Sequence, residues 1–279
     1  MFDLHSHVLP GLDDGAPDLQ TSLAMARAYV EQGVECVVCT PHILPGLYQN
    51  TGPNIREAVR GLQQRLDQAG IALRLAPGAD NHIVPDFVRG LKEGRLLTLA
   101  DSSYVLVEPP HHVAPARLED LFFDICLAGY VPVLTHPERL SWIESKYDVM
   151  ERLAARGVWM QITSGSLCGR FGQRPRRWAQ RMLVEGLVHI LATDAHNMTA
   201  RPPDLLEGRG EAARLVGAEE AEHLVITRPR GALMNIPPSD LPNPFGKAKK
   251  ELRNHAGGHQ GSASRAHGGF GQRVRRLFG

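Results

Sequence analysis

Short runs of β-branched and apolar residues alternate with helical patterns along most of the chain. In the clearest helical pattern, residues 19–32, apolar residues recur every three or four positions after Asp18, an expected N-cap, and before Gly33, an expected stop. Regular alternation of this kind predicts a parallel sheet with its helices outside. The predicted strands are Phe2–Leu4, Val34–Thr40, Ala72–Ala76, Tyr104–Glu108, Val131–Thr135, Val158–Thr163 and Val188–Thr193. The other predicted helices cover about residues 54–69, 116–128, 146–156 and 176–185. Seven strands predict an α/β barrel of the TIM type with seven rather than eight strands.

A change in composition near Pro237 divides the chain. Residues 1–240 have the size and pattern of one barrel domain, whereas residues 241–279 are rich in Gly, Ser, Lys, Arg and His. From Lys247 onwards, eight Lys or Arg residues accompany a single acid, Glu251. Such a segment cannot bury enough apolar surface to offset the entropy of ordering it. We therefore expect a basic, disordered tail whose contacts, if any, are weak and made with a membrane surface or an acidic partner.

Charge and hydropathy narrow the class of protein. The formal net charge of +1 at pH 7 predicts no broad basic surface, so nucleic acid is not expected as a partner. No apolar run approaches the roughly 20 residues that a membrane-spanning helix needs. The first residues also lack the basic and then apolar pattern of a signal peptide. We expect a cytoplasmic protein, and the sequence leaves its oligomeric state open.

Ionisable side chains gather where the predicted strands end. Barrel enzymes carry their active sites at the carboxyl ends of the strands, and six of the seven predicted strands end in His, Asp or Glu. The residues are His5, His7 and Asp14 after the first strand, His42 after the second, Asp80 after the third, Glu108 at the end of the fourth, His136 after the fifth, and Asp194 and His196 after the seventh. Packing requires no such ring, whose members would repel one another or lack partners unless cations satisfied them. The sequence therefore predicts a metal site at this end of the barrel.

The ligand types indicate which metals suit the site. His5 and His7 alternate along an extended segment and so share one face, which lets both imidazoles bind one ion. Mixed imidazole and carboxylate ligation suits zinc, manganese or iron better than calcium. Carboxylates that can bridge predict more than one ion, as in two-metal phosphoryl chemistry.

Two arginines lie beside the predicted ligands. A guanidinium group near metal ions is repelled unless an anionic group arrives, and its planar fork matches phosphate oxygens. The alternative interpretation is an ordinary ion pair with nearby Glu138 or Asp204. Metals and arginines together favour a phosphate ester over a neutral amide as the substrate.

At these positions the sequence closely resembles the PHP (polymerase and histidinol phosphatase) superfamily, and within it the bacterial capsule-type, metal-dependent protein-tyrosine-phosphatase branch. The most specific match is the opening H-x-H-x-L-P-G-x-D-D-G, which runs from His5 to Gly15. Further matching segments are residues 40–42, 107–109, 135–139, 166–172 and 193–196. The resemblance is collinear and covers about residues 2–237.

The resemblance implies a distorted (β/α)7 barrel with two or three divalent metal ions, manganese first, with iron or zinc as alternatives. Carried over by position, one ion takes His5, His7, Asp80 and Asp194, a second takes Asp80, Glu108 and His136, and a third takes Asp14, His42 and His196. Arg139 and Arg201 would hold the phosphate. Asp80 stands where the family usually has Glu, so this shorter carboxylate has to approach differently, or Asn81 or His82 has to assist.

The implied substrate is the phosphotyrosine-bearing tail of a bacterial tyrosine kinase that controls capsule or exopolysaccharide synthesis. We expect a phosphoric monoester hydrolase in which a metal lowers the pKa of a water that attacks phosphorus in line. The metals, Arg139 and Arg201 would neutralise the phosphoryl oxygens. A phenolate leaves comparatively easily, because its conjugate acid has a pKa of about 10. His42 joins the two arginines in the expected catalytic set.

Four other interpretations compete with this one. Cys168 and Arg174 have the C-x5-R spacing of cysteine-dependent tyrosine phosphatases, with a strand before and a helix after. The same metal site would also serve a small-molecule phosphatase such as histidinol phosphatase, or a nuclease-type phosphodiesterase. A degenerate barrel that binds a kinase tail without catalysis is the fourth.

Overall fold

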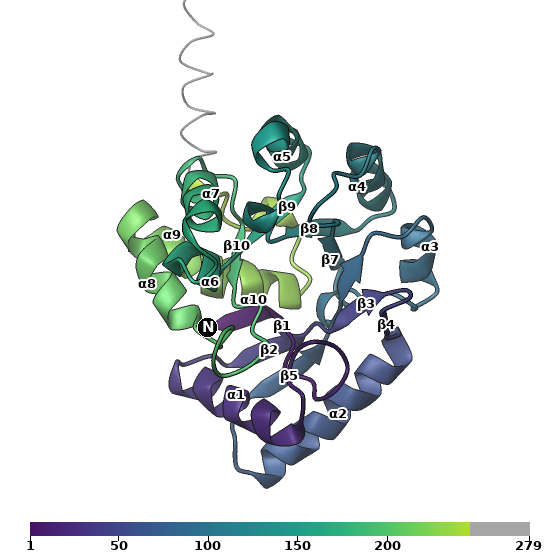
Figure 1. Ribbon diagram of the computed structural model, residues 1–279, viewed down its shortest axis with the longest axis vertical. Helices are drawn as coiled ribbons and strands as arrows, with labels where there is room; N and C mark the ends of the chain where they lie inside the picture. Colours follow the sequence, from purple (N-terminus) through teal and green to yellow (C-terminus); the bar gives the residue numbers. More distant parts are fainter. Residues whose placement is uncertain (246–279) are drawn as a thin grey trace, which may run out of the picture.

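The computed structural model describes residues 1–245, whose strands form two sheets surrounded by helices (Figure 1). The smaller sheet is parallel and has the order β1 (Phe2–Ser6), β2 (Cys36–Cys39), β5 (Arg74–Pro77). The larger sheet has the order β10 (Ile190–Ala192), β9 (Trp159–Thr163), β8 (Val131–Thr135), β7 (Tyr104–Glu108), β6 (Asp80–His82), β3 (His42–Leu44), β4 (Tyr48–Gln49). Every pairing is parallel except the β3–β4 hairpin. The expected α/β class and parallel sheet are confirmed.

Two of the predicted strands each continue into a second strand that lies in the other sheet. After β2 the chain passes Pro41, which has no N–H for a ladder, and resumes as β3. After β5 it passes Gly78, where a Cβ would lie 2.6 Å from Val38 Cγ1. The chain thus changes sheet at these two points. The predicted strands at 34–40 and 72–76 correspond to β2 and β5 and do not include the continuations β3 and β6.

The outer edges of the two sheets meet between β1 and β10. Ser6 and Ala195 form an isolated parallel bridge. The N–H of His7 donates to the carbonyl of Ala195 at 2.9 Å, and the N–H of Asp194 donates to the carbonyl of His5 at 2.8 Å. The strand system therefore curls round until its first and last strands are in contact.

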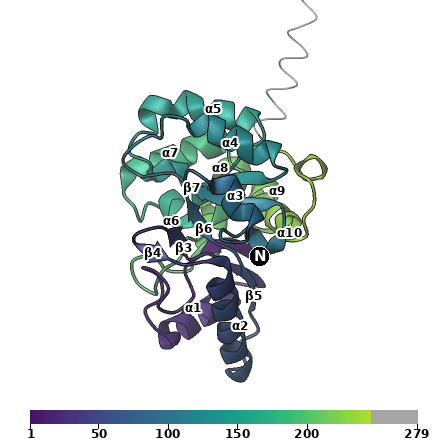
Figure 2. The same ribbon diagram turned by 90° about the vertical axis from the view of Figure 1, so that its right-hand side faces the viewer.

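The helices lie around the outside of the strands (Figures 1 and 2). They are α1 (Leu19–Glu31), α2 (Gly52–Gln68), α3 (Phe87–Lys92), α4 (Leu118–Leu127), α5 (Tyr147–Ala155), α6 (Ser164–Cys168), α7 (Gln173–Val184), α8 (Leu205–Val216), α9 (Ala218–Glu222) and α10 (Arg228–Leu233). Asp18 caps α1 by accepting from the N–H of Thr21, and Gly33 follows its end with φ +77°, both as predicted. The predicted helices correspond to α1, α2, α4, α5 and α7. The sequence pattern missed α3, α6 and α8 to α10, of which all but α8 are six residues or shorter.

An apolar layer lies beneath the strand ends that carry the ionisable residues. Residues two apart on a strand share a face, so Tyr104 and Leu106 face the same way as Glu108, and Trp159 faces the same way as Gln161. The first pair and Trp159 belong to a buried cluster with Leu4, Val38, Leu99, Val133, Ile190, Ala192 and Ala232. The polar residues at the strand ends therefore lie above a buried apolar layer.

Arg228 connects the end of the described chain to the rest of the fold by hydrogen bonds. Its side chain is wholly buried at the start of α10. Its guanidinium donates to the carbonyls of His189 at 2.8 Å and Pro242 at 2.9 Å, and it pairs with the carboxylate of Glu220. The predicted domain boundary at residue 240 thus lies within a segment that is bonded to the fold.

Of the predicted tail, residues 241–279, the part from residue 246 onwards lies outside the described residues. Among residues 1–245, no helix is both long and apolar enough to cross a membrane.

Removing the Arg228 side chain should destabilise the fold strongly, because Glu220 would keep a buried charge without its partner. We expect Arg228→Ala to lower the free energy of unfolding by about 3–5 kcal/mol, measured by urea denaturation. Arg214→Ala is the matched control, since Arg214 is 81% exposed and pairs with Glu211 on the surface; it should change stability by less than about 0.5 kcal/mol. A loss at Arg228 no larger than that of the control would contradict the assignment.

Candidate metal centre

All nine predicted ligands lie in one cluster. His5 belongs to β1, His7 and Asp14 to the loop after it, His42 and Asp80 begin β3 and β6, Glu108 ends β7, His136 follows β8, and Asp194 and His196 follow β10. His42 and Asp80 therefore lie inside strands, where the sequence placed them after strands. All of the nine except His42 and Asp14 are at least 95% buried.

Short distances connect the members of the cluster. His5 Nε2 lies 3.2 Å from His7 Nε2. It also lies 3.5 Å from Asp80 Oδ2 and 3.4 Å from Asp194 Oδ1. The ring centroids of His7 and His196 are 3.9 Å apart. Ligand atoms from segments almost 200 residues apart thus face a common centre.

Several of these atoms have no hydrogen bond. Neither carboxylate oxygen of Asp80 accepts one, although the side chain is fully buried. His136 Nδ1 and His196 Nε2 also lack a partner. A buried ionised group without a partner is costly. Divalent cations would satisfy these atoms, and the donor set of imidazoles and carboxylates fits such ions.

Five groups of three or four side chains have ligand atoms that all lie within 4.8 Å of one another among residues 1–245. They are His7, Asp14, His42 and His196; His5, His7 and Asp80; His5, His136 and Asp194; His42, His82 and Glu108; and Glu108, His111 and His136. The first contains the expected third set with His7 added. Of the others, one lies within the first expected set, and one joins His5 and Asp194 of the first set to His136 of the second. The remaining two contain Glu108 of the second set, one with His42 of the third set and His82, and one with His136 and His111.

Two histidines near Glu108 join the cluster as well. His82 Nε2 lies 2.5 Å from Glu108 Oε2, and His111 Nε2 lies 3.2 Å from Glu108 Oε1. The sequence indicated His82 only as an aid to Asp80 and missed His111, which is separated from the end of β7 by two prolines. Asn81 takes no part, because its amide donates to the carbonyls of Ala79, Leu97 and Leu106.

Other polar side chains orient the histidines from behind. Asp13 Oδ2 accepts from His7 Nδ1 at 2.7 Å and from the backbone N–H of His42 at 2.9 Å. Gln161 Oε1 lies 2.8 Å from His5 Nδ1. Such contacts fix the tautomer and direction of a ligating imidazole. The sequence shows Asp13 within the D-D-G motif but gives it no role, and no sequence pattern pointed to Gln161.

The D-D-G loop also needs its glycine. A Cβ on Gly15 would lie 2.2 Å from the carbonyl oxygen of His7 and 2.4 Å from its Cβ. The N–H of Gly15 donates to Asp13 Oδ1 at 2.9 Å. The absence of a side chain at residue 15 therefore lets the loop fold back against His7 and present Asp13 and Asp14.

Two members of the cluster have an uncommon backbone conformation. His136 has φ +31° and Asp194 has φ +52°, both in the left-handed region. Non-glycine residues seldom adopt it, and such residues concentrate at functional sites where the surroundings hold them. His136 comes directly after β8, and Asp194 comes two residues after the end of β10, so the left-handed backbone redirects a ligand where each strand ends.

The two arginines share one carboxylate oxygen. Arg139 Nη1 and Arg201 Nη2 each lie 2.5 Å from Asp194 Oδ2, while Asp194 Oδ1 faces His5 and His7 at 3.4 and 3.3 Å. The alternative of an ordinary ion pair with Glu138 or Asp204 is therefore not realised, because both guanidinium groups pair with Asp194. Asp194 separates an imidazole side from an arginine side of the same centre.

The pKa values of the cluster residues are shifted by these neighbouring charges and by burial. Burial would raise the pKa of Asp194, but Arg201 and His5 hold it well below its usual value. Burial would lower the pKa of His5, yet Asp194 and Asp80 raise it to about 9. Burial, with Arg139 nearby, lowers the pKa of His136 well below its usual value. Because a ligating imidazole must be neutral, a bound cation would replace the proton on His5.

The C-x5-R alternative lacks the geometry that it needs. Cys168 ends α6, and burial together with Glu207 and Asp204 raises the pKa of its thiol to about 12, which opposes a thiolate nucleophile. Arg174 donates to the carbonyls of Leu140 and Ser141 at 3.2 and 2.8 Å. The two side chains do not form a phosphate-binding loop.

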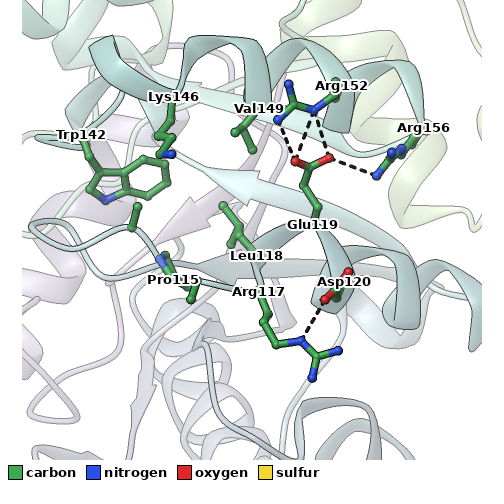
Figure 3. Close-up of a pocket in the computed structure, with 12 residues that line it drawn as sticks. Pro115, Arg117, Leu118, Glu119, Asp120, Trp142, Lys146, Val149, Arg152 and Arg156 are labelled. Carbon is green, nitrogen blue, oxygen red and sulfur yellow. Dashed lines mark hydrogen bonds and ion pairs between the residues drawn. The ribbon is translucent and has the colours of Figure 1, made fainter.

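A cleft of about 510 Å³ between α4 and α5 is also basic, but its three arginines are paired with carboxylates (Figure 3). Arg152 and Arg156 both contact Glu119, at 2.8 and 3.1 Å, and Arg117 pairs with Asp120 at 2.8 Å. None of the ligand groups described above belongs to this cleft, so we assign the chemistry to the His/Asp/Glu cluster.

Comparison with known proteins places the chain among bacterial phosphatases of capsule synthesis. The family model described as "Capsular polysaccharide synthesis, CpsB/CapC" matches residues 1–234. Tyrosine-protein phosphatase YwqE of Bacillus subtilis is 40% identical over 201 residues, which are 72% of this chain and 79% of that protein. Tyrosine-protein phosphatase CpsB of Streptococcus pneumoniae is 28% identical over 240 residues, which are 84% of this chain and 99% of that protein.

A solved structure gives the same result for the fold. It comes from work on YwqE of Bacillus subtilis and CpsB of Streptococcus pneumoniae, described as unique metal-dependent tyrosine phosphatases. The two chains superpose with a TM-score of 0.81 and 36% sequence identity, over 84% of this chain and 95% of the other.

Loss of the Asp13 carboxylate should weaken metal binding, because the imidazole of His7 would lose the group that orients it. We expect Asp13→Ala to reduce manganese affinity about 10- to 100-fold, measured by competition with a fluorescent chelator. Asp124→Ala on α4 is the control, because Asp124 is exposed and distant in sequence from every ligand. Equal manganese affinity in the two variants would refute the orienting role.

Proposed function

The chain belongs to the CpsB/CapC family of capsular polysaccharide synthesis, and on that premise we propose that it is a metal-dependent protein-tyrosine phosphatase. Its proposed substrate is phosphotyrosine on a bacterial tyrosine kinase of capsule or exopolysaccharide synthesis. The observation that carries the proposal is the pair Arg139 and Arg201 beside a buried ring of metal-ligand types. An arriving phosphate offers these guanidinium groups further oxygens beside Asp194 Oδ2, to which both now donate.

The residues proposed to hold the metals are His5, His7, Asp14, His42, Asp80, Glu108, His136, Asp194 and His196. Two or three divalent ions are proposed, manganese first, with iron or zinc as alternatives. When bound, such ions polarise phosphoryl oxygens and make a water acidic enough to supply hydroxide near neutral pH. The hydrogen-bond vacancies at Asp80, His136 and His196 support this assignment.

The chain's own side chains have distinct proposed tasks. Arg139 and Arg201 bind the phosphate and neutralise charge on its oxygens in the transition state. Arg201 Nε has no hydrogen-bond partner and remains available as a donor. His42 is 13% exposed and lies with its Nε2 3.5 Å from Asp14 Oδ1. Because Asp14 is itself 46% exposed, we place these two at the mouth, where the phenolate leaves.

The proposed architecture is a distorted (β/α)7 barrel over residues 1–240. In this interpretation β2 with β3 and β5 with β6 each count as one bent strand, so that the parallel strands number seven. The Ser6–Ala195 bridge supports closure between the first and the last of them. The centre then lies at the carboxyl ends of the strands, which is where barrel enzymes bind their substrates.

Substitution of Arg139 tests the phosphate role directly. We expect Arg139→Ala to lower kcat/KM for a phosphotyrosine peptide by about 100- to 1,000-fold, the range found when one preorganised donor to a transition-state anion is lost. Manganese content, measured by mass spectrometry of the purified protein, should stay at the wild-type level. Wild-type kinetics in this variant would rule out the proposed role of Arg139.

A comparison of substrates separates the tyrosine phosphatase from its rivals. Purified protein is assayed with a phosphotyrosine peptide and with histidinol phosphate, each with manganese and with a chelator. We expect phosphate release from the peptide, lost on chelation, because metals and arginines act together on the phosphoryl group. Preference for histidinol phosphate would indicate a small-molecule phosphatase that uses the same site. Failure to hydrolyse either compound would favour a non-catalytic, tail-binding protein.

A further inference from the structure

The segment from Thr163 to Gly172 contains a motif to which the function proposed above gives no task. It begins where β9 ends, includes α6, and closes with Gly169-Arg170-Phe171-Gly172 before α7. Its cysteine is no nucleophile, and none of its residues belongs to a ligand group. Along the chain it lies between the loop that carries Arg139 and the loop that carries Arg201.

One aromatic ring in this segment contacts both guanidinium groups. The Cζ atom of Arg139 lies 4.6 Å from the centroid of the Phe171 ring, and that of Arg201 lies 6.0 Å from it. Both distances fall within the range of cation–π attraction, which strengthens where water is excluded. Arg139 and Arg201 are only 17% and 20% exposed. The three side chains therefore form one partly buried unit, with Phe171 on one side and Asp194 on another.

The backbone around Phe171 is shaped to bring the ring there. Gly169 has φ +92° and Gly172 has φ +88°, so the turn has left-handed residues on both sides of Arg170 and Phe171. The N–H of Arg170 donates to the carbonyl of Gly165 at 2.8 Å. A Cβ on Gly165 would lie 3.0 Å from Phe171 Cε2, so the ring packs directly on the glycine backbone.

The same segment is bonded to the loop that carries Arg139. Glu138, the preceding residue, is fully buried, and its Oε1 accepts from the N–H and the hydroxyl of Thr163 at 3.0 and 2.8 Å. This contact joins the start of the segment to the backbone of Arg139. Glu138 is thereby used inside the fold and is unavailable as a surface partner for that guanidinium.

On its other side the segment is bonded to the loop that carries Arg201. Arg170 Nε donates to Asp204 Oδ2 at 2.6 Å. Ser164 donates from its hydroxyl to the carbonyl of Asp204 at 2.8 Å. Asp204 follows Arg201 by three residues, so this pair of bonds holds the second loop against the segment. Two loops about 60 residues apart in the chain are thus fixed to one short piece of backbone.

We propose that Phe171 is a positioning residue that holds Arg139 and Arg201 as a single phosphate clamp. The inference rests on the proposed function, because it takes the two arginines as the phosphate-binding groups. In the clamp, the ring face offsets the repulsion between two adjacent guanidinium groups and fixes their distance. The two guanidinium groups are then already in position when phosphate binds, which lowers the entropic cost of binding it.

The test compares Phe171→Ala, Phe171→Leu and Phe171→Tyr with wild type. Affinity for inorganic phosphate is measured by calorimetry on manganese-loaded protein, and kcat/KM is measured with a phosphotyrosine peptide. We expect about a tenfold loss of phosphate affinity in the alanine and leucine variants, with KM rising more than kcat falls, and near wild-type values in the tyrosine variant. Manganese content should not change. Phe123→Ala is the control, as Phe123 is 58% exposed and lies on α4, outside the segment that carries Phe171.

A double-mutant cycle separates positioning from general packing. If Phe171 acts through the arginines, Phe171→Ala should cost much less in the Arg139→Ala background than in wild type. Additive effects would overturn the clamp, as would a leucine variant that binds phosphate like wild type. If Arg139→Ala itself binds phosphate normally, the phosphate role of that arginine fails. If Arg139→Ala loses phosphate while all three Phe171 variants keep it, only the clamp fails.

Discussion

The rest of the structure depends on the need to balance charge in a buried cluster of carboxylates and imidazoles. Asp80 and Asp194 are both almost fully buried and lie within 3.5 Å of the same His5 nitrogen. Such groups are costly to bury unless opposite charge and hydrogen bonds compensate them. The fold supplies part of the compensation through the two arginines and leaves the remaining ligand atoms facing each other. The demand for cations is therefore a property of the packing and not only of the residue types.

Asp194 is where the two halves of the site meet. One of its oxygens faces the imidazoles and the other receives both arginines. The left-handed backbone of Asp194 sets that orientation, and the Phe171 ring contacts both guanidinium groups. The proposed metal ligands and the proposed phosphate-binding groups are thus held by one connected network, so a substitution in one set should alter the other.

Much of this could be predicted from the sequence, because strand periodicity and the position of residues at strand ends carry direct geometric meaning. The family resemblance read from the H-x-H-x-L-P-G-x-D-D-G opening is confirmed by the match to residues 1–234. The nine expected ligands lie together because parallel strands bring their ends to one edge. The strand continuations at β3 and β6 were missed, since a break at Pro41 or Gly78 looks like a strand end.

Contacts made by side chains across the fold could not be predicted in the same way. The ion pairs considered as an alternative for Arg139 and Arg201 involved Glu138 or Asp204, nearby in sequence, whereas both guanidinium groups turn inward to Asp194. Gln161 and His111 gave no pattern at all, because a single polar residue in a strand or turn has many uses. Phe171 belonged to a recognisable motif, but only the distances reveal that its ring contacts two cations.

The most direct test of the central claim is a crystal structure of the protein with manganese and inorganic phosphate, recorded with anomalous scattering from the metal. The account predicts two or three manganese peaks within the His/Asp/Glu cluster and a phosphate in contact with both Arg139 and Arg201. Absence of manganese from the cluster at saturating metal, or a phosphate bound away from the two arginines, would contradict it.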